Sequence, residues 1–389
     1  MVVTLTARKR AFLFFSIILL GLNLRPVLAG IGPLLNQIQA ATGLGDSMAG
    51  MLTTLPVFAM GFCALYGGQL QARLGEYRGI MLGIVVIALA CGSREWLNSG
   101  ISLLVSAAFA GIGIALIQAL VPSFIKSHFS RHSSLLMGFY TTAIMAGAAT
   151  AAASVSPLAN AFGWQRALAC WGIVALVAAL AWRCIPKTCT RKQGAVVVTP
   201  TRRTGIDWLL MAFFGVGTGA YTLVLAWLPP YYIQLGLDAT QSGLMLGGLT
   251  LTEVISGLLV STFINRFPDR RQLLIPVLLT MLAGMIGLIV APLTLTYPII
   301  IMLGIGIGAL FPLSLIVALD RVTESHKTGS LMGFVQGGGY IMASLMPLLA
   351  GFIRQQTAGL EQAWMIMAAG AVVLIVMATR FAPSKTSGH

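Results

Sequence analysis

Two charged residues stand deep inside long apolar stretches, where ionisable side chains are rare. Arg25 lies in the apolar run that begins at Ala11, and Glu253 lies in the run that begins at Thr240. If these runs are helices, each charge lies about 20 Å along its helix, near the middle of a hydrocarbon layer ~30 Å thick. A charge at that depth costs roughly 2.5 to 3.5 kcal/mol and normally marks a transport pathway or a partner. Arg25 therefore predicts a site for a small anionic or strongly dipolar ligand, which its planar five-donor guanidinium suits.

A second interpretation of these charges is a buried ion pair between Arg25 and Glu253 that locks two parts of the molecule together. The two interpretations overlap, since a pair that breaks when a ligand arrives is both lock and site. Glu253 is also a candidate proton carrier. Other polar and aromatic residues at similar depth complete the candidate substrate site: Asn23, Gln118, Tyr140, Tyr221, Trp227, Gln336 and Tyr340. Helix packing or an interfacial aromatic belt also explains such residues, above all Trp227.

The composition excludes a soluble globular protein. Hydrophobic residues make up 57% of the 389 residues and charged residues only 9%, whereas a soluble surface needs about a quarter of the chain charged. A membrane-spanning helix needs about 20 apolar residues. Apolar runs predict twelve spans, near residues 11–36, 47–70, 79–93, 101–125, 135–159, 165–185, 207–233, 240–264, 272–293, 297–319, 330–353 and 363–382. The expected fold class is therefore an all-α membrane protein within a lipid bilayer.

The distribution of basic residues predicts the orientation of these spans. The net charge is +14, and the basic residues fall in every second gap between spans. Lysine and arginine favour cytoplasmic loops, and apart from Arg25 only Arg94, Arg166 and Arg354 fall on the other side. We therefore expect both termini in the cytoplasm and no nucleic-acid partner. The first run also resembles a signal peptide, but Arg25 and eleven further spans favour an uncleaved helix.

An internal repeat divides the chain into two halves of six spans. A shift of 193 residues superposes Gly-Ile-Gly-Ile at 111–114 on 304–307, and a shift of 195 superposes Leu-Met-Gly-Phe at 136–139 on 331–334. We expect an N-terminal half over residues 1–186, a basic cytoplasmic linker over 187–206 and a C-terminal half over 207–389. Parallel halves of this kind are a known transporter architecture, with the substrate bound at their interface.

The loop after the second span resembles a signature loop of the major facilitator superfamily, which reads roughly G-x-x-x-D-R-x-G-x-R-R. Four residues match it: Gly68, Arg73, Gly75 and Arg78. The corresponding loop in the second half has Pro268 in place of the glycine and keeps five residues: Asn265, Arg266, Asp269, Arg270 and Arg271. The resemblance implies that both loops act in conformational change. Ala72 replaces the family's aspartate and Ala107 its span-4 arginine, which weakens an inference of proton coupling from the family.

Within the superfamily, the chain is most similar to the cyanate and nitroimidazole transporter group. The strings that carry the similarity are Leu22 to Pro26, Gly113 to Gln118, Ala226 to Pro229, Phe311 to Leu313 and Gln336-Gly337. The resemblance implies the major facilitator fold of two pseudo-symmetric six-helix halves in the inner membrane of a bacterium. It further implies a secondary transporter that moves a small polar or anionic, cyanate-like solute by alternating access. The alternative is an exporter of nitroimidazole-type or other drug-like compounds.

Other functional classes lack their signatures in the sequence. A primary pump needs a nucleotide site, and the chain has no Gly-Lys dipeptide from which to build a P-loop. An enzyme or metal site needs a cluster of catalytic or ligating residues, and no HExxH motif is present. A channel usually needs a ring of equivalent residues from several subunits. We expect no enzymatic activity, no cofactor and no metal, and a monomer that binds a small-molecule substrate with or without a coupled proton.

Overall fold

The computed structural model describes residues 7–129, 133–185, 203–321 and 325–381 of the chain. Within this part, twelve helical segments are long and apolar enough to cross a membrane. This confirms the predicted all-α class and number of spans. Of the expected linker, residues 187–206, positions 187–202 lie outside the described residues. The next helix begins at Gly205.

The N-terminal half contains the helices up to residue 183. They are α1 (Ala7–Leu22), α2 (Pro26–Ala29), α3 (Ile31–Thr42), α4 (Asp46–Leu65), α5 (Gly67–Leu74), α6 (Glu76–Ser93), the 3-10 turn η1 (Arg94–Trp96), α7 (Gly100–His128), α8 (Ser133–Phe162) and α9 (Trp164–Arg183). The C-terminal half contains α10 (Gly205–Gln234), α11 (Ala239–Phe263), η3 (Ile264–Arg266), α12 (Arg271–Val290), α13 (Thr296–Leu319), α14 (Ser325–Thr357) and α15 (Glu361–Thr379).

The first span is not the continuous helix that the hydropathy predicts for residues 11–36. It breaks between Leu22 and Pro26 and again at Gly30. Pro26 has no N–H to donate to the preceding turn, so the helix cannot continue its hydrogen bonding through this position. Such a break is tolerated at membrane depth where it is enclosed by protein, and residues 23–35 are all buried.

The two halves meet along two seams that are related by the internal repeat. In the first seam α4 packs against α14, and in the second α8 packs against α11. Glycines allow the backbones to touch: a Cβ at Gly50 would meet the carbonyl oxygen of Pro347, and a Cβ at Gly243 would meet that of Ala152. Small residues permit this close helix packing in membranes.

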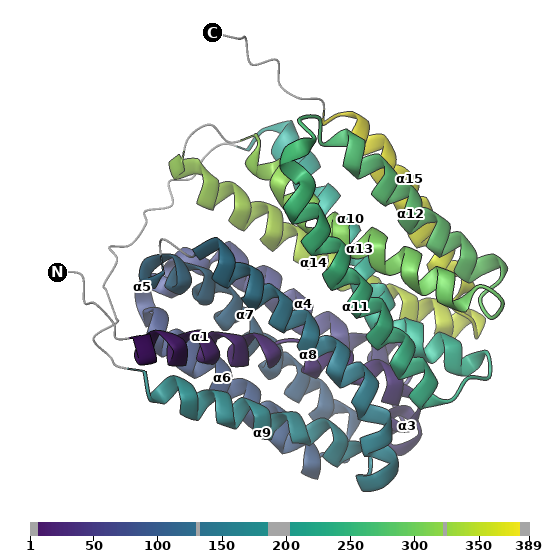
Figure 1. The fold of residues 1–389 in the computed structure, drawn as a ribbon. Coiled ribbons are helices and arrows are strands. Elements are labelled where there is room, and N and C mark those ends of the chain that lie inside the picture. Colours follow the sequence, from purple (N-terminus) through teal and green to yellow (C-terminus); the bar gives the residue numbers. More distant parts are fainter. Residues whose placement is uncertain (1–6, 130–132, 186–202, 322–324, 382–389) are drawn as a thin grey trace.

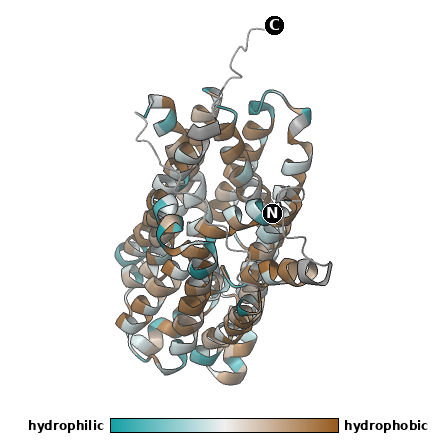
Figure 2. Cartoon of the chain, turned by 90° about the vertical axis from the view of Figure 1, so that its left-hand side faces the viewer, coloured by the Kyte–Doolittle hydropathy of each residue, from teal (hydrophilic) through white to brown (hydrophobic). Residues whose placement is uncertain are grey.

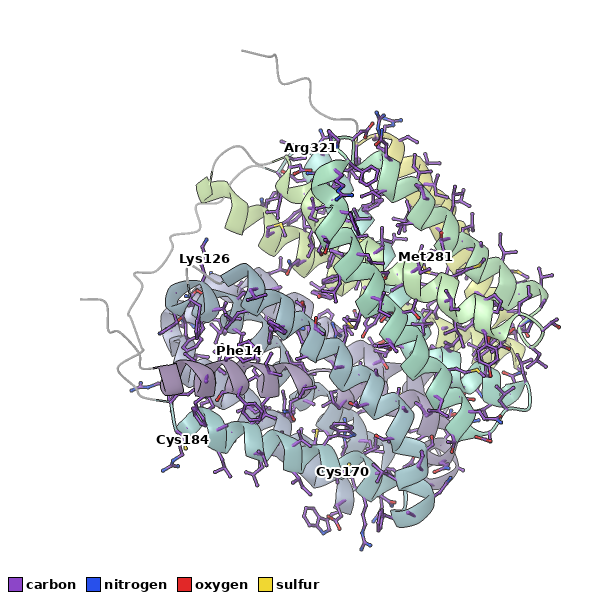
Figure 3. All side chains as sticks on the ribbon, viewed as in Figure 1. Phe14, Lys126, Cys170, Cys184, Met281 and Arg321 are labelled. Carbon is purple, nitrogen blue, oxygen red and sulfur yellow. The ribbon has the colours of Figure 1, made fainter. Side chains whose placement is uncertain are left out.

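The two ends of the bundle are distinguished by the chain termini. We call the end where α1 begins and α15 ends the terminal end, and the opposite end the far end. Lys126 and Cys184 of the N-terminal half and Arg321 of the C-terminal half mark the terminal end in Figure 3. Hydrophobic residues make up most of the helices between the ends (Figure 2), as expected for helices that cross a lipid bilayer.

Candidate substrate site

Arg25 lies at the first break of the first span, directly before α2, and only 4% of its surface is exposed. Its guanidinium carbon lies 5.2 Å from the ring centroid of Tyr221, a cation–π contact. Tyr340 lies near enough to Arg25 to interact with its charge. Because Tyr221 belongs to α10 and Tyr340 to α14, Arg25 makes its contacts across the interface between the halves.

Two further buried residues, Tyr140 of α8 and Glu253 of α11, interact electrostatically with Arg25. We name this set the Arg25 cluster: Arg25, Tyr140, Tyr221, Glu253 and Tyr340. The N-terminal half supplies the cation and one tyrosine, and the C-terminal half supplies the carboxylate and two tyrosines. Tertiary packing therefore brings together five of the predicted site residues from separate helical segments.

Several polar atoms of the Arg25 cluster have no hydrogen-bond partner in the described part of the chain. They are Nε of Arg25, both carboxylate oxygens of Glu253 and the hydroxyls of Tyr140 and Tyr221. A buried polar atom left unpaired costs about 1 to 3 kcal/mol. No hydrogen bond joins Arg25 to Glu253 in this conformation, so the direct ion pair of the second interpretation is not formed. Unpaired donors and acceptors gathered at one point of the interface suit a small polar ligand.

Small residues of α13 fix the position of Glu253. A Cβ at Gly308 would meet the Cα of Glu253, and a Cβ at Gly304 would lie 2.6 Å from the Cβ of Thr252. The Ser256 hydroxyl lies 3.0 Å from the carbonyl oxygen of Glu253 and 3.2 Å from that of Gly304, and bonds both. The repeated glycine string thus allows α11 to pack directly on α13 and fixes the backbone position of Glu253.

Asn23 is buried beside Arg25, but its side chain serves the helix break. Its Nδ2 donates to the carbonyl oxygen of Leu19 at 2.7 Å. This carbonyl is among those that have no backbone partner at the end of a helix. Gln118 of α7 and Gln336 of α14 are half-buried. For these three residues, contact with substrate stays a prediction.

Trp227 lies away from the Arg25 cluster, toward the far end. Its Nε1 donates to the carbonyl oxygen of Pro347 at 2.9 Å, and the Arg354 guanidinium lies 5.4 Å from its ring centroid. Arg354 also pairs with Asp46 at the start of α4, at 3.4 Å. The predicted substrate contact of Trp227 remains untested, and its position favours a role in joining the two halves.

The signature loop of the N-terminal half forms α5 and the turn into α6. Gly68 and Arg73 lie in α5, Arg78 lies in the first turn of α6, and Gly75 stands between them with a φ of 70°, which favours glycine. Where the family has its aspartate, Ala72 forms no polar contact. Instead, the neighbouring Gln71 donates to Ser123 of α7 at 2.8 Å.

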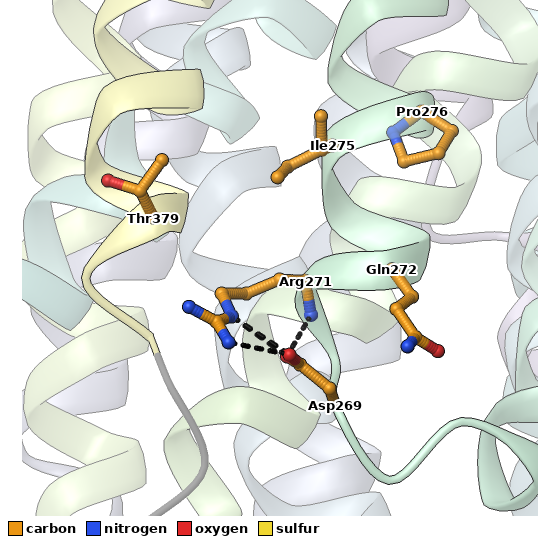
Figure 4. Close-up of a pocket in the computed structure, with 6 residues that line it drawn as sticks. All are labelled: Asp269, Arg271, Gln272, Ile275, Pro276 and Thr379. Carbon is orange, nitrogen blue, oxygen red and sulfur yellow. Dashed lines mark hydrogen bonds and ion pairs between the residues drawn. The ribbon is translucent and has the colours of Figure 1, made fainter.

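The signature loop of the C-terminal half is held by its own charges. Arg270 donates to Asp320 at 2.8 Å, and Arg271 binds both carboxylate oxygens of Asp269 (Figure 4). These hydrogen bonds lower the pKa of Asp269 below its ordinary value. Arg266 lies over the ring of Phe263 at 4.9 Å. Asp269 and Arg271 line an open hollow between α12 and Thr379 of α15.

The described part of the chain contains no group of three His, Cys, Asp or Glu side chains that could hold a metal ion. Of the three arginines expected on the far side, Arg166 has a well-exposed side chain at 66%. By contrast, Arg94 is 1% exposed and the Arg354 side chain 15%. The sequence predicts only the side of the membrane on which these arginines lie, and a residue's place at a helix end does not tell which way its side chain turns.

Comparison with known proteins decides the family. The sequence profile of the Major Facilitator Superfamily matches residues 11–327 and 235–389. The chain belongs to the major facilitator superfamily. This superfamily member is a multi-pass membrane transporter, and the resemblance predicted from its loops and span strings is confirmed.

Two relatives of this major facilitator protein match over nearly the whole chain. It is 36% identical over 371 residues to the cyanate transport protein CynX of Escherichia coli K12, covering 94% of this chain and 96% of that protein. It is 30% identical over 384 residues to the 2-nitroimidazole transporter of the same organism, covering 97% and 96%. These relatives are transporters rather than enzymes.

Solved structures of low sequence identity share the fold. The inward open conformation of the xylose transporter XylE from E. coli matches with a TM-score of 0.78 at 15% identity, over 96% of this chain and 97% of that one. The nucleoside transporter NupG matches with a TM-score of 0.74 at 12% identity, over 95% and 99%. The likeness shows the major facilitator fold of this chain.

Proposed function

We propose that this transporter carries a small anionic, cyanate-like solute by alternating access, with Arg25 as its anion-binding residue. The observation that carries the proposal is the position of Arg25: buried at the interface of the halves, with Nε unpaired and no hydrogen bond to Glu253. The buried charged residues of the described chain are Arg25, Arg94 and Glu253, two cations against one carboxylate. An anion would balance this excess. A relative that is named a cyanate transport protein adds support.

The Arg25 cluster suggests how such an anion would be held. The guanidinium provides charge and a planar fork of donors. The hydroxyls of Tyr140 and Tyr221, which have no partner among the described residues, can donate to the other end of a short anion. Because ligands come from both halves, binding would favour the halves closing around the solute, which is what alternating access requires.

Glu253 is the proposed coupling residue. As a carboxylate it competes with a bound anion for the field of Arg25, because like charges at short range repel. When Glu253 takes up a proton, this repulsion is removed and the anion binds Arg25 more tightly, so proton and anion would travel together. Both oxygens of Glu253 are free of protein partners in the described chain and can accept that proton.

The proposed orientation in the membrane rests on the distribution of basic residues among the loops. We propose that both termini face the cytoplasm, that the far end faces outward, and that the protein works as a monomer in a bacterial inner membrane with residues 187–206 as a linker. The excess of lysine and arginine in the gaps at the terminal end supports this orientation.

Uptake of labelled cyanate into proteoliposomes tests the proposal, with and without an imposed proton gradient. We expect Arg25→Gln to abolish saturable uptake and Arg25→Lys to raise KM at least about tenfold, since a hydrogen bond to a charged group is worth about 1.5 to 3 kcal/mol. Glu253→Gln should transport without responding to the gradient. The exposed Arg166→Gln serves as the matched control and should behave as wild type.

Two results would overturn these assignments. Wild-type protein that is folded and inserted but shows no cyanate flux would refute the anion assignment. Flux of 2-nitroimidazole in that protein would then favour the alternative, which the tyrosine rings and the 30% identical relative support. Cyanate flux that ignores the gradient in wild type would remove the coupling role of Glu253 and leave passive facilitation.

A further inference from the structure

Arg94 is a second buried arginine that the proposed transport mechanism does not use. It opens the turn η1 at the far end of α6, yet only 1% of its surface is exposed, while its neighbour Trp96 is 75% exposed. The side chain therefore turns inward, into the N-terminal half. No carboxylate contacts it in the described chain, and its Nη2 has no hydrogen-bond partner there.

The contacts of Arg94 lead to the broken first span. Nε donates to the Ser106 hydroxyl of α7 at 3.0 Å, and Ser106 donates to the carbonyl oxygen of Ala90 at 2.8 Å. Nη1 reaches the carbonyl oxygen of Val27 at 3.5 Å. Val27 belongs to α2, the four-residue helix that directly follows Arg25.

Val27 lies where the backbone hydrogen bonds of α2 end. Ala29 donates to Arg25 and Gly30 donates to Pro26, and the chain then turns into α3. The carbonyl of Val27 is the next acceptor in this series, and Arg94 approaches it from outside the helix. A four-residue helix fixes its own direction poorly, because helix formation is cooperative and most helical stability comes from tertiary packing.

We propose that Arg94 is a positioning residue for Arg25. It holds α2 by the carbonyl of Val27, braced through Ser106 against α6 and α7, so that Arg25 points across the interface toward Tyr221 and Tyr340. This inference rests on the proposed function of Arg25 as the anion-binding residue.

Transport kinetics of Arg94→Gln, Arg94→Lys and the control Arg166→Gln test the proposal. Arg166 lies in α9 near the same end and pairs with Glu95, the neighbour of Arg94, at 3.4 Å with its side chain 66% exposed. We expect Arg94→Gln to raise KM for labelled cyanate about tenfold, with Vmax per folded transporter within about threefold of wild type. Arg94→Lys should recover part of the affinity, and Arg166→Gln should change neither parameter.

A double-mutant cycle shows whether Arg94 acts through Arg25. If it does, Arg94→Gln combined with Arg25→Lys has nearly the KM of Arg25→Lys alone, because effects of coupled residues do not add. Additive effects, or a loss of Vmax and thermal stability at unchanged KM, would overturn the proposal and leave Arg94 a packing residue.

Amide hydrogen exchange separates failure of this proposal from failure of the proposed function. Exchange at Leu28, Ala29 and Gly30 reports the hydrogen bonds of α2 and needs no substrate. Arg94→Gln should speed this exchange at least about tenfold relative to Arg166→Gln. Unchanged exchange would refute positioning by Arg94 even if cyanate is transported. Faster exchange in a protein that does not transport cyanate would refute the proposed substrate and leave the positioning of α2 by Arg94 supported.

Discussion

The two ends of the interface between the halves are held differently. At the far end, polar side chains reach across it: Asp46 pairs with Arg354 at 3.4 Å, and Ser47 donates to Gln355 at 2.5 Å. In the second seam, the Ser156 hydroxyl donates to the carbonyl oxygen of Ala239 at 3.0 Å. At the terminal end, the contacts shown by the signature loops stay within one half, as Gln71 to Ser123 and Arg270 to Asp320 do.

This difference indicates which end must open for the cycle to proceed. At the terminal end, the ends of α12 and α15 stand apart from those of α1 and α9 in Figure 1. Polar side chains thus join the halves at the far end, whereas toward the terminal end the α4–α14 seam is packed through glycines, since a Cβ at Gly61 would lie 2.7 Å from the carbonyl oxygen of Gly337. Exposing the Arg25 cluster to the far side requires the contacts between Asp46, Arg354 and their neighbours to break, while the loop contacts can persist.

The largest expected effect comes from a substitution that prevents far-end closure. Gly50→Val places side-chain atoms where the carbonyl oxygen of Pro347 now lies. Overpacking of this kind costs about 1 to 3 kcal/mol, here only in the state closed at the far end. We expect uptake of labelled cyanate to fall about tenfold or more. Ser344 is buried, and we expect Ser344→Cys in this variant to react faster with an impermeant maleimide from the far side than it does without Gly50→Val.

Gly248→Val in α11 is the matched control, because a Cβ there would meet nothing within 4 Å. Both variants need a background from which the five native cysteines have been replaced. Equal labelling of Ser344→Cys in the two variants would show that the α4–α14 seam does not close the far end.

The spans could be predicted from the sequence because each membrane-spanning backbone must satisfy its own hydrogen bonds, which forces long apolar helices. The break at residues 23–25 was not predicted, although Pro26 marks it. A hydropathy window averages over such a break. The irregular backbone is tolerated at that depth because the surrounding helices of the protein enclose it.

A smaller effect is expected from the ion pair at the far end. Asp46 lies in the first turn of α4 and Arg354 in the last turn of α14, where each charge also complements its own helix dipole. Their side chains are 24% and 15% exposed, so the pair is worth up to about 1 kcal/mol. Asp46→Asn and Arg354→Gln should each raise far-side labelling of Ser344→Cys by up to about fivefold.

The double variant Asp46→Asn with Arg354→Gln sharpens this test. If the two charges act as a pair, the double variant labels no faster than either single one. Summed effects would mean that each charge acts through its own helix, and the far end would then be held by glycine packing alone.

The candidate site was predictable only in part. Arg25 and Glu253 stand out in the sequence because a charge in an apolar span needs a reason. Tyr140, Tyr221 and Tyr340 gain their meaning from packing that brings separate helices to Arg25. Trp227 has the same sequence signal but lies elsewhere. Arg94 was assigned to a loop by its neighbours, since sequence spacing does not show that a side chain turns inward from a helix end.

The smallest effect is expected at the terminal end, where Asp269 and Arg271 bond within one half (Figure 4). Hydrogen bonds from Arg271 lower the pKa of Asp269, so the stabilising contribution is present above the ordinary carboxyl value of about 3.9 and is lost as pH falls through the lowered pKa. Across pH 5 to 8 the contact should therefore stay intact. Asp269→Asn should change uptake by less than about twofold and leave the labelling of Ser344→Cys unchanged. If it instead shifted labelling as far as Asp46→Asn does, the loop would act on the opening of the far end, and the contrast between the two ends would fail.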